Sequence, residues 1–305
     1  MPKVSILLTC YNHLPYLGAC VDGILAQTFD DYEVIAVDDG STDGTREWLQ
    51  KHGDGITLLF NDSNLGTYGS LNRALEAASG DYIAILNDDD LWAPKKLAMQ
   101  VAMMEAHPEV GLVHTNGEFI DGEGKRIEGS PLGFEFPRTE TGDVLLALAY
   151  HNKIIASAAL VRRVCFSDLG AFNPAYFGSG DWEMWFRVAE RWQVGFVDEP
   201  LTFYRVHGAN ASHKLERIWQ DDARLREWMR GRLGALAAGR FPAAEVLRAK
   251  AHNLACLGTV LTLNGDASGG RKAYWASIRL MPLRLKSWAR WAATFLPRRS
   301  FRRLT

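Results

Sequence analysis

Features that would assign this sequence of 305 residues to several familiar protein classes are absent. Its four cysteines form no CxxC pair and no zinc-finger spacing, which excludes a disulfide or zinc framework and favours a reducing cytoplasm. No run approaches the roughly 18 consecutive apolar residues that span a bilayer, and the apolar stretch at residues 4–10 is too short for a secretory signal. No GxGxxG motif follows that stretch, which argues against a dehydrogenase. We therefore expect a cytoplasmic protein, attached at most to a membrane surface.

Acidic residues are absent from residues 271–305, which contain ten Lys and Arg residues although the whole chain has a formal net charge of −2. Apolar residues recur there at helical spacing, interrupted by Pro282: they are Trp275, Ile278, Met281, Leu285, Trp288, Trp291 and Phe295. A basic amphipathic tail suits the anionic inner face of a membrane, and packing of the same stripe on the rest of the protein is the alternative. No base-reading module accompanies the charge, so we expect no nucleic-acid partner.

Strand and helix patterns alternate through the first third of the chain. Strands are predicted at residues 4–9, 32–38, 56–60 and 82–87, and helices at residues 16–28, 45–52 and 67–78. A helix at 94–107 and a strand at 110–115 follow, and then a segment rich in Gly, Pro and charge (117–137) that suggests a hairpin or a mobile loop. A strand (154–161), a helix (181–192) and a strand (196–204) come next. The alternation predicts an α/β fold with a Rossmann-like, mostly parallel sheet flanked by helices. From about residue 215 the pattern is helical, which predicts a C-terminal helical extension.

An acidic cluster ends the strand predicted at residues 82–87. Asp88, Asp89 and Asp90 would repel one another unless solvent, arginine or a cation offsets their charge, and Mg²⁺ and Mn²⁺ accept oxygen ligands of this kind. Ligands of such sheets bind beyond the carboxyl ends of the strands, where the polar segments 9–12 and 38–41 also fall. The pattern therefore predicts a metal-dependent site at this edge of the sheet.

Four motifs occur in the order and spacing found in the inverting glycosyltransferases of family 2, which have the GT-A fold. They run from Val4 to Asn12, from Val37 to Thr45, from Asn87 to Trp92 and from Gly180 to Arg187. The sequence resembles this family over residues 3–210. The resemblance implies a GT-A domain with a nucleotide-sugar-binding half at residues 1–115 and an acceptor-binding half at residues 116–214. A helical extension with the basic tail follows at residues 215–305.

Residues for binding the nucleotide follow from the resemblance. It implies that Thr9 and Tyr11 lie beside the base, that Asp39 accepts the ring N–H of uracil or thymine, that Asp88 lies towards the ribose or the metal, and that Asn64 lines the donor pocket. A carboxylate can accept such a charge-assisted hydrogen bond, and an aromatic ring offers a stacking face. The alternative is that Tyr11 caps the core and that Asp38 and Asp39 open a turn.

Residues for the metal also follow from the resemblance. Asn87 stands where the family's DxD motif usually begins with an aspartate, so Asp89 is the carboxylate expected to contact Mg²⁺ or Mn²⁺. His207 resembles a histidine that completes the metal or phosphate site, with a structural histidine as the alternative. Arg205 could pair with phosphate or with a surface acid.

Asp181 matches the family's catalytic base, although Gly180 stands where an acidic residue is common. A carboxylate within hydrogen-bond reach can accept the proton of an attacking sugar hydroxyl. The alternative is that Asp181 is only the N-cap of the following helix. Asp90 is expected to cap the helix after Pro94.

The resemblance implies a metal-dependent, inverting transferase of the hexosyltransferase type. It would move a sugar from a UDP or dTDP donor to a hydroxyl of a glycan or lipid-linked acceptor, in cell-surface polysaccharide synthesis. One alternative is a sugar nucleotidyltransferase, which needs a glycine-rich triphosphate loop that residues 9–14 do not offer. Another is a catalytically silent scaffold that binds sugar nucleotides or glycans, which Asn87 and Gly180 favour.

Overall fold

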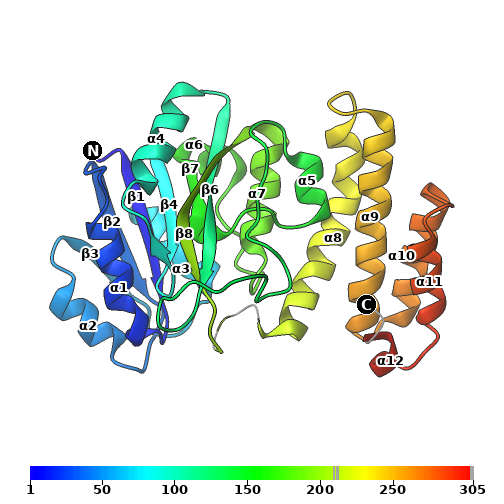
Figure 1. The fold of residues 1–305 in the computed structure, drawn as a ribbon, viewed down its shortest axis with the longest axis horizontal. Helices are drawn as coiled ribbons and strands as arrows, with labels where there is room; N and C mark the ends of the chain where they lie inside the picture. The colour runs from blue at the N-terminus through cyan, green and yellow to red at the C-terminus, as the bar shows by residue number, and fades with distance from the viewer. Residues whose placement is uncertain (209, 211–212, 303–305) are drawn as a thin grey trace. The chain divides into compact units, whose positions relative to one another are not determined.

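The computed structural model, which describes residues 1–208, 210 and 213–302, contains an eight-stranded sheet (Figure 1). Its strand order is β3-β2-β1-β4-β7-β6-β8-β5. The strands are Val4–Cys10 (β1), Tyr32–Asp38 (β2), Ile56–Phe60 (β3), Tyr82–Asn87 (β4), Leu91–Trp92 (β5), Val110–Ile120 (β6), Ala159–Arg162 (β7) and Gln193–Arg205 (β8). Strands β1 to β4 are mutually parallel, β6 is parallel to β8, and β7 is antiparallel to both β4 and β6.

The chain divides into two units. Unit 1 comprises Met1–Val144, Lys153–Tyr176 and Gly180–Asn210, and contains the whole sheet. Unit 2 comprises Leu145–Asn152, Phe177–Ser179 and the described residues that follow Asn210.

Helices cover both faces of the sheet in unit 1, as the alternating pattern predicts. Successive residues of a strand point to opposite faces, so Ile6 and Leu8 of β1 pack with α1 and α4, whereas α3 contacts β1 and β2 from the other face. The helices of unit 1 are Leu14–Leu25 (α1), Thr45–His52 (α2), Thr67–Ala77 (α3), Lys96–Ala106 (α4), Arg163–Leu169 (α6) and Gly180–Arg191 (α7), with a 3₁₀ turn at Ala156–Ala158.

The largest difference from the predicted elements is β6, which continues through Ile120 into the segment at residues 117–137 predicted to be a hairpin or a mobile loop. Residues 116–120 pair with residues 200–205 of β8, so a strand far away in the sequence supplies their hydrogen-bond partners. Gly117 permits this approach, because a Cβ atom there would lie 2.0 Å from the backbone oxygen of Thr202. Local composition could not reveal this partner strand, because the strand lies far away in the sequence.

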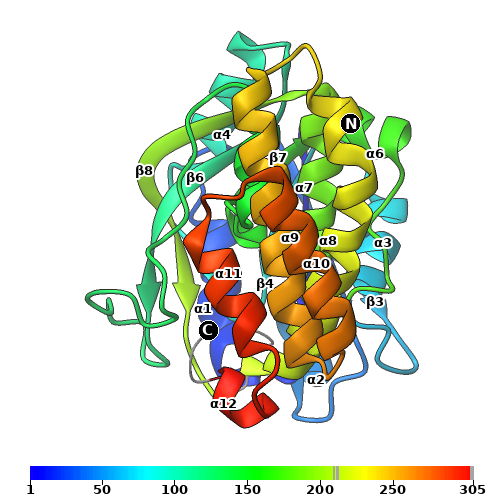
Figure 2. The ribbon, with the colours of Figure 1, turned by 90° about the vertical axis from the view of Figure 1, so that its right-hand side faces the viewer.

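Unit 2 is helical, and its C-terminal part confirms the predicted extension. Its helices are Leu145–Tyr150 (α5), Leu215–Ala237 (α8), Ala243–Leu263 (α9), Ala267–Leu280 (α10), Leu285–Ala293 (α11) and Arg298–Arg302 (α12). Buried Tyr274 donates to or accepts from the hydroxyl of Thr259 at 2.7 Å and joins α10 to α9. Figure 2 shows α10 and α11 in contact on one side of α9. Within the described residues, no helix is long and apolar enough to cross a membrane.

Candidate functional site

Four strands of unit 1 end at the same edge of the sheet. Strands β1, β2 and β4 are parallel, and β8 runs in the same direction because two antiparallel pairings separate β4 from β6. The polar segments that follow these strands, at residues 9–13, 38–41, 87–90 and 205–207, therefore gather at one edge, where sheets of this type bind ligands.

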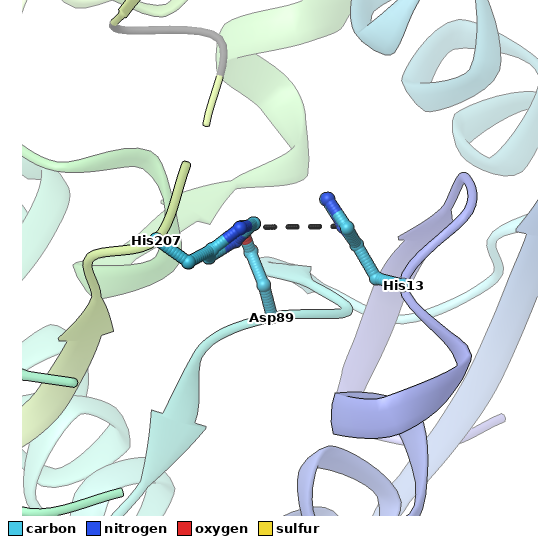
Figure 3. Close-up of side chains that lie close together, drawn as sticks. All are labelled: His13, Asp89 and His207. Carbon is cyan, nitrogen blue, oxygen red and sulfur yellow. Dashed lines mark hydrogen bonds and ion pairs between the residues drawn. The ribbon is translucent and has the colours of Figure 1, made fainter. Parts of the chain in front are cut away.

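At this edge, His13, Asp89 and His207 point toward one another (Figure 3). One ligand atom from each lies within 4.8 Å of the others. Nε2 of His207 is 3.0 Å from Oδ2 of Asp89, and Nδ1 of His13 is 4.0 Å from the same oxygen. The amide of Asn210 also donates to this oxygen, at 3.3 Å. The structure thus brings together the two residues predicted for the metal, Asp89 and His207, and adds His13.

The carboxylate of Asp88 faces the same histidine from the other side. Its Oδ1 lies 2.8 Å from Nδ1 of His13, and its Oδ2 accepts a hydrogen bond from the backbone N–H of Tyr11 at 2.9 Å. Burial alone would lower the pKa of His13, but the hydrogen bond and the charge of Asp88 outweigh it and raise that pKa to about 8. Burial raises the pKa of Asp88 despite the histidine.

Asp90 does not cap the next helix, so that prediction is wrong. Its side chain is fully buried, accepts the backbone N–H of Arg205 at 2.9 Å and also accepts the hydroxyl of Ser157. Burial and the charge of Asp89 raise its pKa well above the usual range. Helix α4 begins only at Lys96, too far along the chain for Asp90 to reach its first N–H groups. Asp90 instead joins the end of β4 to the end of β8.

Arg205 is buried and forms no ion pair with a surface acid in the part of the chain that the structure describes, so that alternative is wrong. Its Nε donates to the backbone oxygen of Asp89 at 2.7 Å, and one terminal nitrogen donates to the backbone oxygens of Asp121 and Gly122 at 2.8 and 3.1 Å. The guanidinium also lies 4.7 Å from the ring centre of Tyr16. This buried cation therefore fixes the backbone that carries Asp89.

Asp39 organises the loop after β3. Its Oδ1 accepts the backbone N–H of Leu65 and the amide of Asn61, both at 2.7 Å, and its Oδ2 accepts the backbone N–H of Gly66 at 2.9 Å. Asn64 lies in this loop with its side chain exposed, and its amide oxygen accepts the same Gly66 N–H at 3.1 Å. Asp39 therefore sets the shape of the loop that contains Asn64.

Thr9 and Tyr11 lie at the end of β1. The hydroxyl of Thr9 is almost buried and donates to the amide oxygen of Asn87 at 3.3 Å. Tyr11 is exposed, which leaves a face of its ring open for stacking. The next residue, Asn12, has a φ of 55°, in the left-handed region, and its amide oxygen accepts the N–H of Thr42 at 2.8 Å. That turn joins β1 to the loop after β2.

Asp181 lies in the first turn of α7, which begins at Gly180. The hydroxyl of Tyr68 donates to its Oδ1 at 3.3 Å, and the N–H of Trp182 donates to the same oxygen at 2.7 Å. A Cβ atom at residue 180 would lie 2.7 Å from the Tyr68 ring, which gives a steric reason for glycine at this position.

A chain of contacts joins Asp181 to Asp39. Tyr68 and Ser70 both belong to α3, the hydroxyl of Ser70 accepts the amide of Asn61 at 2.9 Å, and that amide also donates to Asp39. The same helix therefore contacts the loop expected to hold the base and the carboxylate expected to accept a proton.

Sequence reasoning missed four residues of this site: His13, Asn61, Tyr68 and Asn210. His13 carried a usable signal, since it is a polar residue directly after the first strand. Tyr68 and Asn61 carried none, because their contacts with Asp181 and Asp39 depend on how α3 packs.

Comparison with known proteins decides the family. Residues 5–169, more than half of the chain, match the family model described as glycosyl transferase family 2. The chain belongs to glycosyltransferase family 2. The resemblance noted in the four motifs is thereby confirmed.

Curated relatives of this glycosyltransferase include bacterial and archaeal proteins. An uncharacterised glycosyltransferase of Nostoc sp. is 29% identical over 219 residues, which cover 68% of this chain and 66% of that relative. One from Methanocaldococcus jannaschii is 28% identical over 224 residues, covering 71% of this chain and 74% of the relative.

Solved structures confirm the GT-A fold. Residues 1–349 of S. aureus TarS, in complex with UDP-GlcNAc, align with a TM-score of 0.68 at 16% identity, covering 92% of this chain and 82% of that one. The mannosyltransferase PcManGT of Pyrobaculum calidifontis, in complex with GDP-Man and Mn²⁺, aligns with a TM-score of 0.61 at 23% identity, covering 98% and 83%.

Proposed function

We propose that this glycosyltransferase is a metal-dependent, inverting enzyme that moves a hexose from a UDP or dTDP donor to a hydroxyl of a glycan or lipid-linked acceptor. The observation that carries the proposal is the gathering of His13, Asp89 and His207 at the sheet edge that also presents Tyr11 and Asp39. The ligands named for TarS and for the Pyrobaculum enzyme support a nucleotide sugar as donor.

The residues at the edge fit a divalent cation. One carboxylate and two imidazoles lie within reach of a common ion, and this mixed oxygen and nitrogen set suits Mn²⁺ better than Mg²⁺, which prefers oxygen alone. Burial raises the pKa of Asp88 and Asp90, which flank Asp89, and a nearby cation would favour the charged form of both carboxyl groups. Asp89, His207 and His13 would hold the ion. When bound, it would neutralise the diphosphate and stabilise it as a leaving group.

The preference for a pyrimidine donor rests on Asp39. Its Oδ2 accepts one protein N–H, from Gly66, so a carboxylate lone pair is left to accept the ring N–H of uracil or thymine. The exposed ring of Tyr11 would stack on the base, and Thr9, Asn64 and Asp88 would line the nucleotide. We assign residues 1–115 to the donor and residues 116–214 to the acceptor.

In the proposed reaction, Asp181 accepts the proton of the acceptor hydroxyl as its oxygen forms a bond to the anomeric carbon. The bond from that carbon to the diphosphate breaks at the same time, on the opposite face, which inverts the configuration. The Tyr68 hydroxyl and the backbone N–H of Trp182 both donate to Oδ1 of Asp181 and orient the carboxylate that would take the proton. Burial of Asp181 excludes water that would compete as acceptor.

The base is tested by Asp181→Asn, with Tyr68→Phe as the milder companion. We expect Asp181→Asn to lower the rate of sugar transfer by about 10²- to 10⁴-fold, because the amide cannot accept the proton, while UDP binding by calorimetry stays within about twofold. Tyr68→Phe removes one hydrogen bond and should lower kcat about threefold to tenfold. Retained turnover in Asp181→Asn would remove this residue from the role of base.

A silent scaffold remains the alternative that Asn87 and Gly180 favoured. Calorimetry with UDP, with and without Mn²⁺, followed by an assay of UDP release from UDP-sugars, separates the two functions. Binding without release would support the scaffold. Preference for GDP over UDP and dTDP would show that the reading of Asp39 is wrong.

The place of the reaction is part of the proposal. We infer a cytoplasmic enzyme, peripheral at the inner face of the membrane, that contributes to cell-surface polysaccharide synthesis. All four cysteines are free, which agrees with a reducing compartment.

A further inference from the structure

Helix α11 has an unusual distribution of side chains within unit 2. Its apolar residues at spacings of three and four are exposed, although such a stripe usually faces the protein core. The exposed residues along this face and its continuation are Leu285, Trp288, Ala289, Ala292, Phe295 and Leu296. The opposite side buries the small residues Ser287, Ala293 and Thr294. The apolar face of α11 is therefore turned to solvent.

Neighbouring residues enlarge this face. Leu283, in the turn between α10 and α11, is 91% exposed, and Leu285 is 76% exposed. Trp275 on α10 is also exposed, and its ring packs edge-on against Trp288 with a centroid separation of 5.8 Å. We call Trp275, Leu283, Leu285, Trp288, Phe295 and Leu296 the α11 surface. Such a contiguous exposed apolar patch marks a binding surface in a protein that is otherwise well packed.

The tail stripe read from the sequence is only partly the same surface. Ile278 is buried, and Trp291 packs against the core that contains Tyr274 and Phe301. The difference arises because α10 ends at Leu280 and α11 starts at Leu285, so the turn at Pro282 resets the helical register. The second helix, rather than one continuous stripe, presents the exposed face.

Cations surround the α11 surface. Lys272, Arg279 and Lys286 are exposed, and no acidic residue lies between residues 271 and 305. Among the described residues of this segment, only Arg298 forms an ion pair with a carboxylate, that of Glu216 at 3.6 Å. The guanidinium of Arg271 lies 4.9 Å from the ring centre of Phe295. Most of this positive charge is therefore left for an external partner.

We propose that the α11 surface docks on an anionic phospholipid bilayer. Tryptophan, phenylalanine and leucine on one helix face with lysine and arginine at its rim are the composition of helices that lie in the membrane interface. Tryptophan favours the headgroup level, and each nearby Lys or Arg adds attraction to an anionic leaflet. A second copy of the chain fits less well, because a symmetric contact would bring two sets of the same cations together.

Vesicle co-sedimentation of the full-length protein tests the proposal independently of sugar transfer. One set of vesicles is pure phosphatidylcholine, and the other contains about one third phosphatidylglycerol. We expect binding to the anionic set only, and loss of that binding at about 0.5 M NaCl, where screening shortens the range of the attraction. Equal binding to both sets, or binding to neither, would overturn the proposal.

Two substitutions at highly exposed positions identify the surface. The double variant Leu283→Asp/Leu285→Asp should weaken vesicle binding at least about tenfold, because two inserted side chains become charged. The matched control is Leu25→Asp/Leu215→Asp, two exposed leucines outside the surface, which should change binding less than about twofold. UDP calorimetry verifies that both variants are folded. Unchanged vesicle binding by the first variant would exclude this surface.

Sedimentation velocity tests whether a second copy of the chain, rather than a membrane, covers the α11 surface. The wild-type chain without vesicles should stay at one oligomeric state as its concentration rises. Concentration-dependent association that Leu283→Asp/Leu285→Asp abolishes would show that the α11 surface joins two copies, and would overturn membrane docking.

Discussion

Replacement of Arg205 by lysine tests whether this buried cation acts on the fold or on the donor. The guanidinium donates to three backbone oxygens, those of Asp89, Asp121 and Gly122. Lysine keeps the charge but has one nitrogen, and it can retain about one of these contacts. Each hydrogen bond to a charged group contributes about 1.5–3 kcal/mol, so losing two should lower the free energy of unfolding by about 3–6 kcal/mol. That is a large part of the about 5–15 kcal/mol that keeps a typical protein folded.

Urea unfolding followed by tryptophan fluorescence measures this loss. Arg126→Lys is the matched control, because its side chain is 69% exposed and pairs with Glu118 at 3.2 Å, so its effect should stay within about 0.5 kcal/mol. Calorimetry below the unfolding transition should show an unchanged Kd for UDP in Arg205→Lys. If Arg205→Lys unfolds at the wild-type urea concentration while its Kd for UDP rises, the guanidinium binds phosphate and our interpretation is refuted.

Two further predictions concern the pH dependence of stability and the metal dependence of sugar transfer. Burial lowers the pKa of His114 to about 3. Below pH 6.5 the unfolded chain therefore takes up a proton at this residue that the folded chain does not. The free energy of unfolding should fall by about 1.4 kcal/mol per pH unit from this residue alone. His114→Gln should flatten urea-derived stability between pH 7 and pH 5 relative to wild type, and parallel curves would show that His114 is protonated in the fold. EDTA should abolish sugar transfer and Mn²⁺ should restore it, with His207→Ala needing at least about tenfold more Mn²⁺; full activity in EDTA would refute the metal assignment.

Residues close together in the chain were the ones that sequence patterns located best. The acidic run after β4 and the polar segments after β1 and β2 follow directly from their strands, and parallel pairing places them at one edge. His207 was found only through the family motif, since a lone histidine carries little information. Its contact with Asp89 arises because Leu91 and Trp92, which follow the acidic run as β5, pair with β8 just before His207.

Packing decided several side-chain contacts that the sequence left open. Arg205 pairs with no surface acid, because the ends of β4, β6 and β8 enclose it and offer carbonyl oxygens. Asp90 was assigned to a helix cap because it precedes a helix, but Ser157 and the backbone of Arg205 compete successfully for its carboxylate. Tyr68, which no motif indicated, contacts the proposed base.

The amino-acid sequence by itself determined the alternating elements, the polar strand ends, the family and the cationic tail, since periodicity, turn chemistry and charge are local properties. Only the tertiary structure decided which histidines face Asp89, which side chain holds Asp181 and which face of α11 meets solvent. These contacts join residues from about 70 to about 120 positions apart, and strand pairing and helix packing, which act between distant segments, set them.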